Sequence, residues 1–115
     1  MKSEESILQQ SCVKWFRYEY PQHQRFLVSV ANEGKRTPKN GARMKAQGMI
    51  AGISDLILFD PESVQMPIFL ECKTQKGRQS QSQKEFEAEY TEAGYKYYIF
   101  RSFDEFRELV NNYLQ

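Results

Sequence analysis

The spacing of apolar residues changes along the chain from helical to strand-like and back. Near the N-terminus, apolar residues recur every three or four positions between Ile7 and Phe16, which predicts a helix. Ser3 supplies an N-cap for this helix, and Pro21 ends it. The later apolar runs are short, and they predict strands at 26–31, 54–60, 67–74 and 95–101.

Two further helices are predicted on either side of the last strand. One starts at Ser80 or Ser82 and stops at Gly94, and the other follows Ser102 and carries apolar residues at helical spacing to Leu114. The order α-β-β-β-α-β-α predicts one α/β domain over residues 1–115, with a mixed four-stranded sheet flanked by helices. Its aromatic residues are most simply core residues.

The segment 32–51 is polar, glycine-bearing and basic, and we expect a loop with a short helix around 41–47. Between Gly34 and Ser54 it has no acid, and its basic residues are Lys35, Arg36, Lys39, Arg43 and Lys45. Acids predominate instead at 85–108, so the net charge of +1 hides a separation of charge. We expect the basic segment, extended by Lys76 and Arg78, to face a polyanion; a solvated loop is the alternative.

Length, composition and cysteine usage limit the class of protein. A chain of 115 residues with 40% hydrophobic residues can bury the core of one domain. Cys12 and Cys72 are not spaced as zinc ligands, and we expect two buried free thiols in a reducing compartment. No signal peptide or membrane-spanning run is present, so we expect a soluble, intracellular protein.

The candidate chemistry lies where two predicted strands carry ionisable residues. Asp55 belongs to the run 54–60, and Glu71 and Lys73 belong to the run 67–74. If the two runs pair as an antiparallel hairpin, the numbers of paired residues sum to about 126–128. Asp55 then lies opposite residues 71–73, and Glu71 and Lys73 share one face of the strand because side chains alternate.

Two carboxylates and a lysine at one place fit a divalent-metal site for phosphodiester hydrolysis. Carboxylate oxygens are suitable ligands for Mg²⁺ or Mn²⁺, and the ion would activate water and stabilise the charge of the transition state. Lys73 would orient or deprotonate that water, or neutralise a phosphate oxygen. The alternative is a buried ion pair that stabilises the hairpin, but it leaves one carboxylate unexplained.

Gly-Ile-Ser-Asp55 followed by Glu71-Cys-Lys73 resembles the motif of the PD-(D/E)xK nuclease superfamily, with Ser54 where many members have proline. The sequence is most similar to one branch, the virus-type replication-repair nuclease (VRR-NUC) domain of the stand-alone phage or bacterial type. Its matching motifs are Asn-Glu-Gly-Lys-Arg (32–36), Gly-Ala-Arg-Met-Lys (41–45), Gly-x-x-x-Gly-x-x-Asp-Leu (48–56), Glu-x-Lys-Thr (71–74) and Gly-Arg-x-Ser-x-x-Gln (77–83).

The resemblance implies a restriction-endonuclease-like core and a set of site residues. Asp55 and Glu71 would be metal ligands, and Lys73 would be the catalytic lysine. Glu5 matches a first-helix glutamate of the metal site, with Glu4 as the fallback and Gln9, one turn later, as a support. Gln83 matches a helix glutamine near the active site. An ordinary first-turn acid for Glu5 and a surface helix residue for Gln83 are the alternatives.

The resemblance also implies a function. We expect a metal-dependent, structure-selective DNA endonuclease that cuts branched DNA such as Holliday junctions, acts as a homodimer and works in the cytoplasm of a bacterium or phage host. The basic residues listed above would contact DNA phosphates without reading sequence. A flap or nicking nuclease with the same site and a non-catalytic DNA-binding module are the alternatives.

Overall fold

The computed structural model describes residues 3–30 and 38–115. In chain order the elements are α1 (Glu4–Glu19), the 3-10 helix η1 (Pro21–Phe26), β1 (Leu27–Ser29), α2 (Pro38–Ala46), β2 (Leu56–Leu58), β3 (Ile68–Cys72), α3 (Gln81–Glu92), β4 (Lys96–Phe100) and α4 (Phe103–Leu114). The predicted α/β order is confirmed, with η1 as an element that the sequence did not predict. None of the described helices is long and apolar enough to cross a membrane.

The four strands form one mixed sheet in the order β1-β2-β3-β4. The pairs β1–β2 and β2–β3 are antiparallel, whereas β3 and β4 are parallel and are connected through α3. A parallel pair needs such a crossover because the chain must return to the starting edge of the sheet. The carboxyl ends of β3 and β4 therefore lie at the same edge, next to the amino end of β2.

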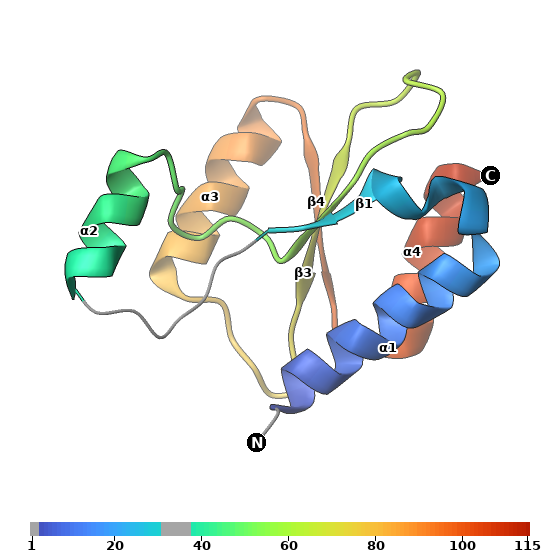
Figure 1. The fold of residues 1–115 in the computed structure, drawn as a ribbon, viewed down its shortest axis with the longest axis horizontal. Helices are drawn as coiled ribbons and strands as arrows, with labels where there is room; N and C mark the ends of the chain where they lie inside the picture. Colours follow the sequence, from blue (N-terminus) through green and yellow to red (C-terminus); the bar gives the residue numbers. More distant parts are fainter. Residues whose placement is uncertain (1–2, 31–37) are drawn as a thin grey trace.

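Helices cover both faces of this sheet. Figure 1 shows α3 on one side of the strands and α1 with α4 on the other. On the α1 and α4 side, Leu56, Leu70 and Phe100 pack with Phe16 and Phe106 in the larger core cluster. On the α3 side, a smaller cluster joins Phe69 and Tyr97 to Phe86. Because side chains alternate along the strands, each strand contributes residues to both cores. The strand runs are therefore apolar at nearly every position.

The helix ends follow the predicted signals. The hydroxyls of Ser3, Ser80 and Ser102 each accept a hydrogen bond from the backbone N–H three residues later. Gly94 ends α3 with a φ of 106°, a conformation that side chains rarely adopt. The strands are shorter than the apolar runs predicted, because the last residues of each run continue into loops. Both cysteines are buried free thiols, as expected.

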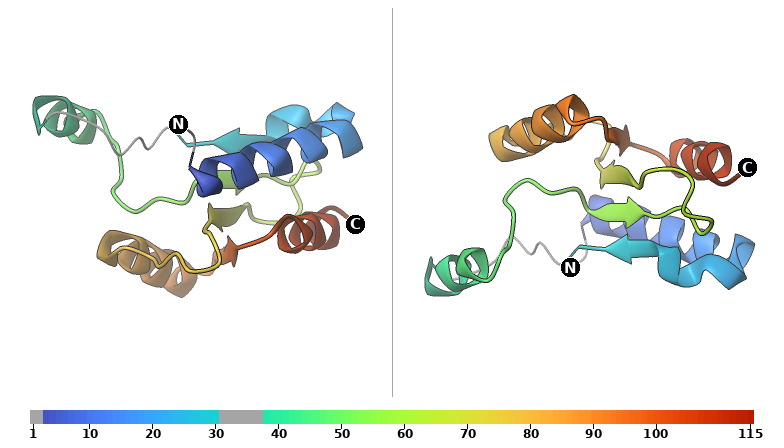
Figure 2. Two further views of the ribbon diagram at one scale, coloured as in Figure 1. Left: turned by 90° about the horizontal axis from the view of Figure 1, so that it is seen from below. Right: turned by 90° about the horizontal axis from the view of Figure 1, so that it is seen from above.

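Helix α2 differs from the other helices in its position. Figure 2 shows it standing apart from the sheet and from the helices that cover it. The predicted helix around 41–47 is confirmed in this segment and begins slightly earlier, at Pro38. Of the predicted DNA-binding residues, Lys35 and Arg36 precede α2 and lie outside the described residues, as does the side chain of Lys39 within α2.

Candidate active site

The antiparallel pairing of β2 with β3 brings the motif residues together. The observed pairs are Leu56 with Leu70, Ile57 with Phe69 and Leu58 with Ile68, each summing to 126. One step beyond the apolar pairs, this register places Asp55 opposite Glu71, as the hairpin arithmetic predicted. Lys73 follows on the same face of the chain as Glu71. A carboxylate oxygen of Asp55 accepts a hydrogen bond of 2.8 Å from the backbone N–H of Cys72, which ties it to the end of β3.

Glu71 is the most buried charged group of the described residues, with 0% of its surface exposed. Neither carboxylate oxygen has a hydrogen-bond partner, and the ammonium of Lys73 stands 3.8 Å from one of them. Burial raises the pKa of Glu71 to about 7, the charge of Lys73 opposes this rise and the charge of Asp55 adds to it. An ionisable side chain with unsatisfied oxygens in the protein interior is costly unless it serves a ligand.

The carboxylates of Asp55 and Glu5 belong to the same electrostatic cluster. Burial raises the pKa of Asp55, whereas the hydrogen bond from the Cys72 N–H and the charge of Lys73 lower it. Burial also raises the pKa of Glu5, with Lys73 lowering it and Asp55 raising it further. Lys73, only 9% exposed, is thus the cation that all three acids share.

Helix α1 places Glu5 in this cluster by its contact with β3. The thiol of Cys72 donates a hydrogen bond of 3.4 Å to the backbone carbonyl of Glu5, which fixes the first turn of α1 against the end of the strand. Glu5 is half-buried there, whereas Glu4 is exposed. The geometry therefore favours Glu5 over Glu4 as the first-helix member of the site. Gln9 is half-buried one turn further along α1.

The loop before β2 is held in place by a glycine and a serine. Gly52 has a φ of 81°, and a Cβ built there would lie 2.1 Å from the backbone carbonyl oxygen of Ser82 in α3. Only glycine lets this loop pass so close to the first turn of α3. Ser54, fully buried, donates a hydrogen bond of 2.9 Å to the carbonyl of Leu56. These contacts set the direction from which Asp55 enters the site.

Gln83 lies in the first turn of α3, and its side-chain oxygen is engaged in the helix cap. It accepts a hydrogen bond of 2.8 Å from the backbone N–H of Ser80, while the Ser80 hydroxyl accepts one from the backbone N–H of Gln83. This reciprocal pair is a capping box. The catalytic role of Gln83 stays a prediction, since its side-chain oxygen is occupied by the helix terminus in this structure.

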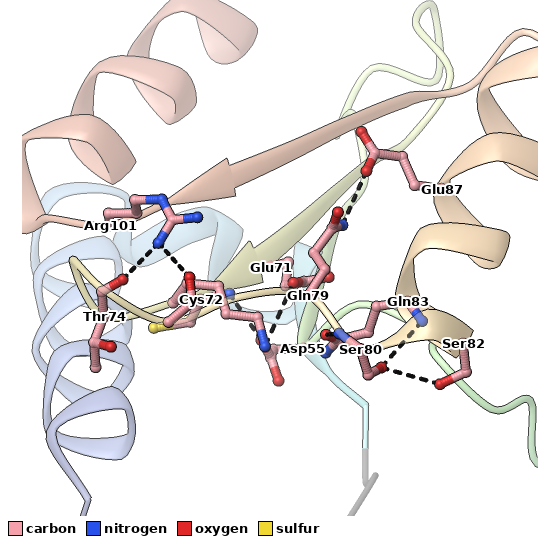
Figure 3. A network of polar contacts seen from close by, with 12 residues as sticks. Asp55, Glu71, Cys72, Thr74, Gln79, Ser80, Ser82, Gln83, Glu87 and Arg101 are labelled. Atoms are coloured by element: carbon pink, nitrogen blue, oxygen red, sulfur yellow. Dashed lines mark hydrogen bonds and ion pairs between the residues drawn. The ribbon is translucent and has the colours of Figure 1, made fainter.

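Two polar residues near the site were missed in the sequence. Figure 3 shows Gln79 between Glu71 and Glu87; its amide donates a hydrogen bond of 2.9 Å to Glu87, and it is among the groups that oppose the burial-driven rise in the pKa of Glu71. Arg101 donates to the carbonyls of Thr74 and Gly77, each at 2.7 Å, and so clamps the loop after Lys73. The parallel pairing of Cys72 with Phe100 is what places Arg101 beside that loop.

The basic residues predicted to contact DNA occupy two places. Lys76 and Arg78 are exposed on the loop between β3 and α3, a few residues after Lys73. Arg43 and Lys45 are exposed on α2, the helix that stands apart from the sheet. The first pair is therefore close to the carboxylates along the chain, whereas the second is carried on a separate element.

The donor set fits a hard divalent cation. In the part of the chain that the structure describes, no group of three Asp, Glu, His or Cys side chains is placed to hold a metal ion, so Glu5, Asp55 and Glu71 are not brought together as a three-carboxylate site. Mg²⁺ does not need one, because it keeps several waters and takes one or two carboxylates together with substrate phosphate oxygens. The two unsatisfied oxygens of Glu71, with Asp55 opposite, supply such a partial ligand set.

Comparison with known families decides the assignment. Residues 3–104 match the family model of the VRR-NUC domain. The chain belongs to the VRR-NUC family. It is therefore a nuclease domain of the PD-(D/E)xK type, as the motifs at Asp55 and at Glu71 to Lys73 indicated.

A solved structure supports the VRR-NUC fold independently. A protein described as "VRR_NUC domain protein" superposes with a TM-score of 0.79 at 17% sequence identity, covering 98% of this chain and 89% of its own. At this identity the likeness concerns the fold. None of the curated proteins compared with the chain matches it.

Proposed function

We propose that this VRR-NUC domain is a metal-dependent, structure-selective DNA endonuclease that acts on branched DNA such as Holliday junctions. The observation that carries the proposal is the buried carboxylate of Glu71, which has no hydrogen-bond partner and lies beside Asp55 and Lys73. The ammonium of Lys73, at 3.8 Å, is too far away for a hydrogen bond, so the cost of burying this carboxylate is only partly offset. A cation and a phosphate that enter from the strand ends would satisfy it.

The proposed mechanism divides the work among six side chains. Asp55 and Glu71 would hold Mg²⁺ or Mn²⁺, with Glu5 as the third carboxylate of the cluster. When bound, the ion lowers the pKa of the attacking water and stabilises the charge that develops on the phosphate. Lys73 orients that water or neutralises a phosphate oxygen, since its ammonium already lies among the acids. Lys76 and Arg78 hold the neighbouring phosphates by charge.

The experiment is a cleavage assay on matched four-way, flap, nicked and linear DNA with Mg²⁺, Mn²⁺ or EDTA. We expect cutting of branched DNA with either metal and none in EDTA. Asp55→Ala and Lys73→Ala should each slow cleavage on the order of 100-fold or more, because each removes a group that acts on the reacting phosphate. Unchanged cleavage by both variants would refute the site.

The same set of DNA substrates decides which DNA shape the domain prefers. Faster cutting of flaps or nicks than of four-way junctions would replace the junction proposal with a flap or nicking nuclease. DNA binding without cleavage of any substrate by the wild type would make the domain a binding module.

We also propose that the domain acts as a homodimer, since a two-fold dimer with one site per protomer matches a symmetric junction. Sedimentation at several concentrations measures the assembly directly. Mixed dimers of wild type and Lys73→Ala should cut one strand only. A monomer that cuts both strands at normal rates contradicts the dimer.

A further inference from the structure

A groove of about 600 Å³ runs between α1 and β1, outside the carboxylate cluster. Six of its eight lining residues are polar, namely Gln9, Gln10, Ser11, Lys14 and Arg17 from α1 and Ser29 from β1, but Ile7 and Val13 also line it, and more of its wall is apolar than polar. In Figure 2, β1 lies beside α1, and the amino end of the helix and the carboxyl end of the strand point the same way. The groove thus has one helical wall and one strand wall, and its lining differs from the predicted basic surface.

The charge of this groove is positive. Between Glu5 and Glu19, helix α1 carries the bases Lys14 and Arg17 and no acid. Among the described residues the ion pairs are those of Lys73 with Glu71 and of Arg107 with Asp104. Lys14 and Arg17 therefore have no carboxylate partner in that part of the chain. Arg17 also suits the negative end of the helix dipole, but Lys14 lies before the last turn and has no such role.

Both walls of the groove lead to the catalytic carboxylates. On the helix wall, Gln9 is one turn from Glu5, whose first-turn position is fixed by the thiol of Cys72. On the strand wall, Ser29 pairs with Leu56, and the next N–H, that of Val30, donates a hydrogen bond of 2.9 Å to the backbone carbonyl of Asp55. Among the described residues, no helix or strand separates the site from this end of the groove, so a polymer that occupies the site can continue into it.

We infer that the α1–β1 groove binds the phosphodiester backbone of a duplex arm next to the scissile phosphate. This inference rests on the proposed nuclease function. The distance from Gln9 to Arg17 along the helix is about 12 Å at 1.5 Å per residue, which spans about three to four nucleotides at 3.4 Å per nucleotide along a strand. Hydroxyls, amides and two cations are the groups that contact DNA phosphates.

The lining favours a duplex over a single strand. None of the described residues that line the groove is aromatic, whereas proteins that hold single strands stack bases on aromatic rings. The nearest exposed aromatic residue of α1 is Tyr18, which is 83% exposed and lies beyond the lining residues. Tyr18→Ala therefore tests the choice, because only a single-strand path past the groove would use this ring.

The experiment measures DNA binding in EDTA by fluorescence anisotropy over a range of salt concentrations, with a short duplex and a four-way junction. Each lost phosphate contact reduces the salt slope by about 0.9. The double variant Lys14→Ala/Arg17→Ala should reduce it by about 1.8 and weaken binding about 30-fold at 0.15 M salt. The matched control, Lys96→Ala/Arg107→Ala, removes the same charge from exposed residues of β4 and α4 and should leave the slope unchanged.

Cleavage by the same variants separates this inference from the proposed function. Lys14→Ala/Arg17→Ala should raise KM and leave kcat near the wild-type value, since neither residue lies among the reacting groups. If the wild type cuts DNA but the double variant keeps the salt slope of the control, the groove is not a DNA contact. If Tyr18→Ala weakens binding of a single-stranded arm as much as the double variant does, the duplex assignment is wrong. If the wild type neither binds nor cuts any DNA, the proposed function fails first.

Discussion

Replacing Glu71 by glutamine should make the metal-free domain more stable at neutral pH. Glu71 is fully buried, and neither of its oxygens has a hydrogen-bond partner. Burial, against the charge of Lys73, raises the pKa of Glu71 from 4.5 to about 7. Glutamine has nearly the same shape without the ionisation, so it removes the cost of a buried charge.

The size and the pH dependence of this effect follow from the pKa. The rise from 4.5 to about 7 corresponds to about 3 kcal/mol at roughly 1.4 kcal/mol per pH unit. Because the folded state holds the proton more tightly than the unfolded state, the free energy of unfolding of the wild type falls as pH rises between these two values and is then constant. Glu71→Gln lacks this fall. The variant should match the wild type below pH 4.5 and exceed it by up to about 3 kcal/mol at pH 8.

Urea denaturation in EDTA at pH 4.5, 6, 7 and 8 measures this difference, with activity recorded in parallel. Glu62→Gln, the same change at an exposed position of the turn between β2 and β3, is the matched control and should show no pH-dependent gain. Asp55 and Glu5 titrate in both proteins, so their contributions cancel except for the part that arises from the coupling of Asp55 to Glu71. A variant that is less stable than the wild type at pH 8, or a difference that does not change with pH, would refute the reasoning.

Three further predictions concern the loops and the metal. Gly52→Ala should lower the free energy of unfolding by about 3 kcal/mol or more and abolish cleavage, since the Cβ of the alanine would collide with the backbone carbonyl of Ser82. An unchanged melting temperature would contradict the close approach of this loop to α3. Arg101→Ala should lower the free energy of unfolding by about 2 kcal/mol, because the backbone carbonyls of Thr74 and Gly77 lose their hydrogen-bond donor. A lower kcat with little change in KM would show that this loop positions Lys73. Mg²⁺ at 100 times its Kd should raise the free energy of unfolding of the wild type by about 2.7 kcal/mol. Asp55→Asn should lose most of this gain, and an equal gain in both proteins would place the ion elsewhere.

The central part of the site could be predicted because it depends on local pairing. Alternation within the two runs and the length of the turn between them fixed the register to within two residues, and the observed pairs sum to 126. The cap at Ser102 was also predictable, since a hydroxyl before a helical run satisfies N–H groups that the helix leaves open, and the cap at Ser80 was one of two candidates, with Ser82. In each case the interacting residues lie close in sequence.

The missed residues depend on contacts between distant segments. Arg101 reaches the loop after Lys73 only because β4 returns parallel to β3, a pairing that no short-range pattern sets. Gln79 is placed by the path of the loop into α3. Gln83 is different, because Ser80-x-x-Gln83 is a local capping-box pattern that accounts for the observed hydrogen bonds, whereas the resemblance had assigned Gln83 to the active site.

The position of the site at the end of the paired strands explains how one hairpin serves both stability and chemistry. The pairs Leu56 with Leu70 and Leu58 with Ile68 are buried, and they fix the register by the apolar area that they remove from water. The next position outward holds Asp55 and Glu71, where the β2–β3 pairing has ended, although Glu71 still pairs with Ile99 of β4. The Cys72 N–H there donates to a carboxylate oxygen of Asp55. On a free loop the two acids would not have been held together. The strand end gives the carboxylates the rigid spacing of the sheet, and the raised pKa of Glu71 is the consequence of holding this carboxylate in the interior.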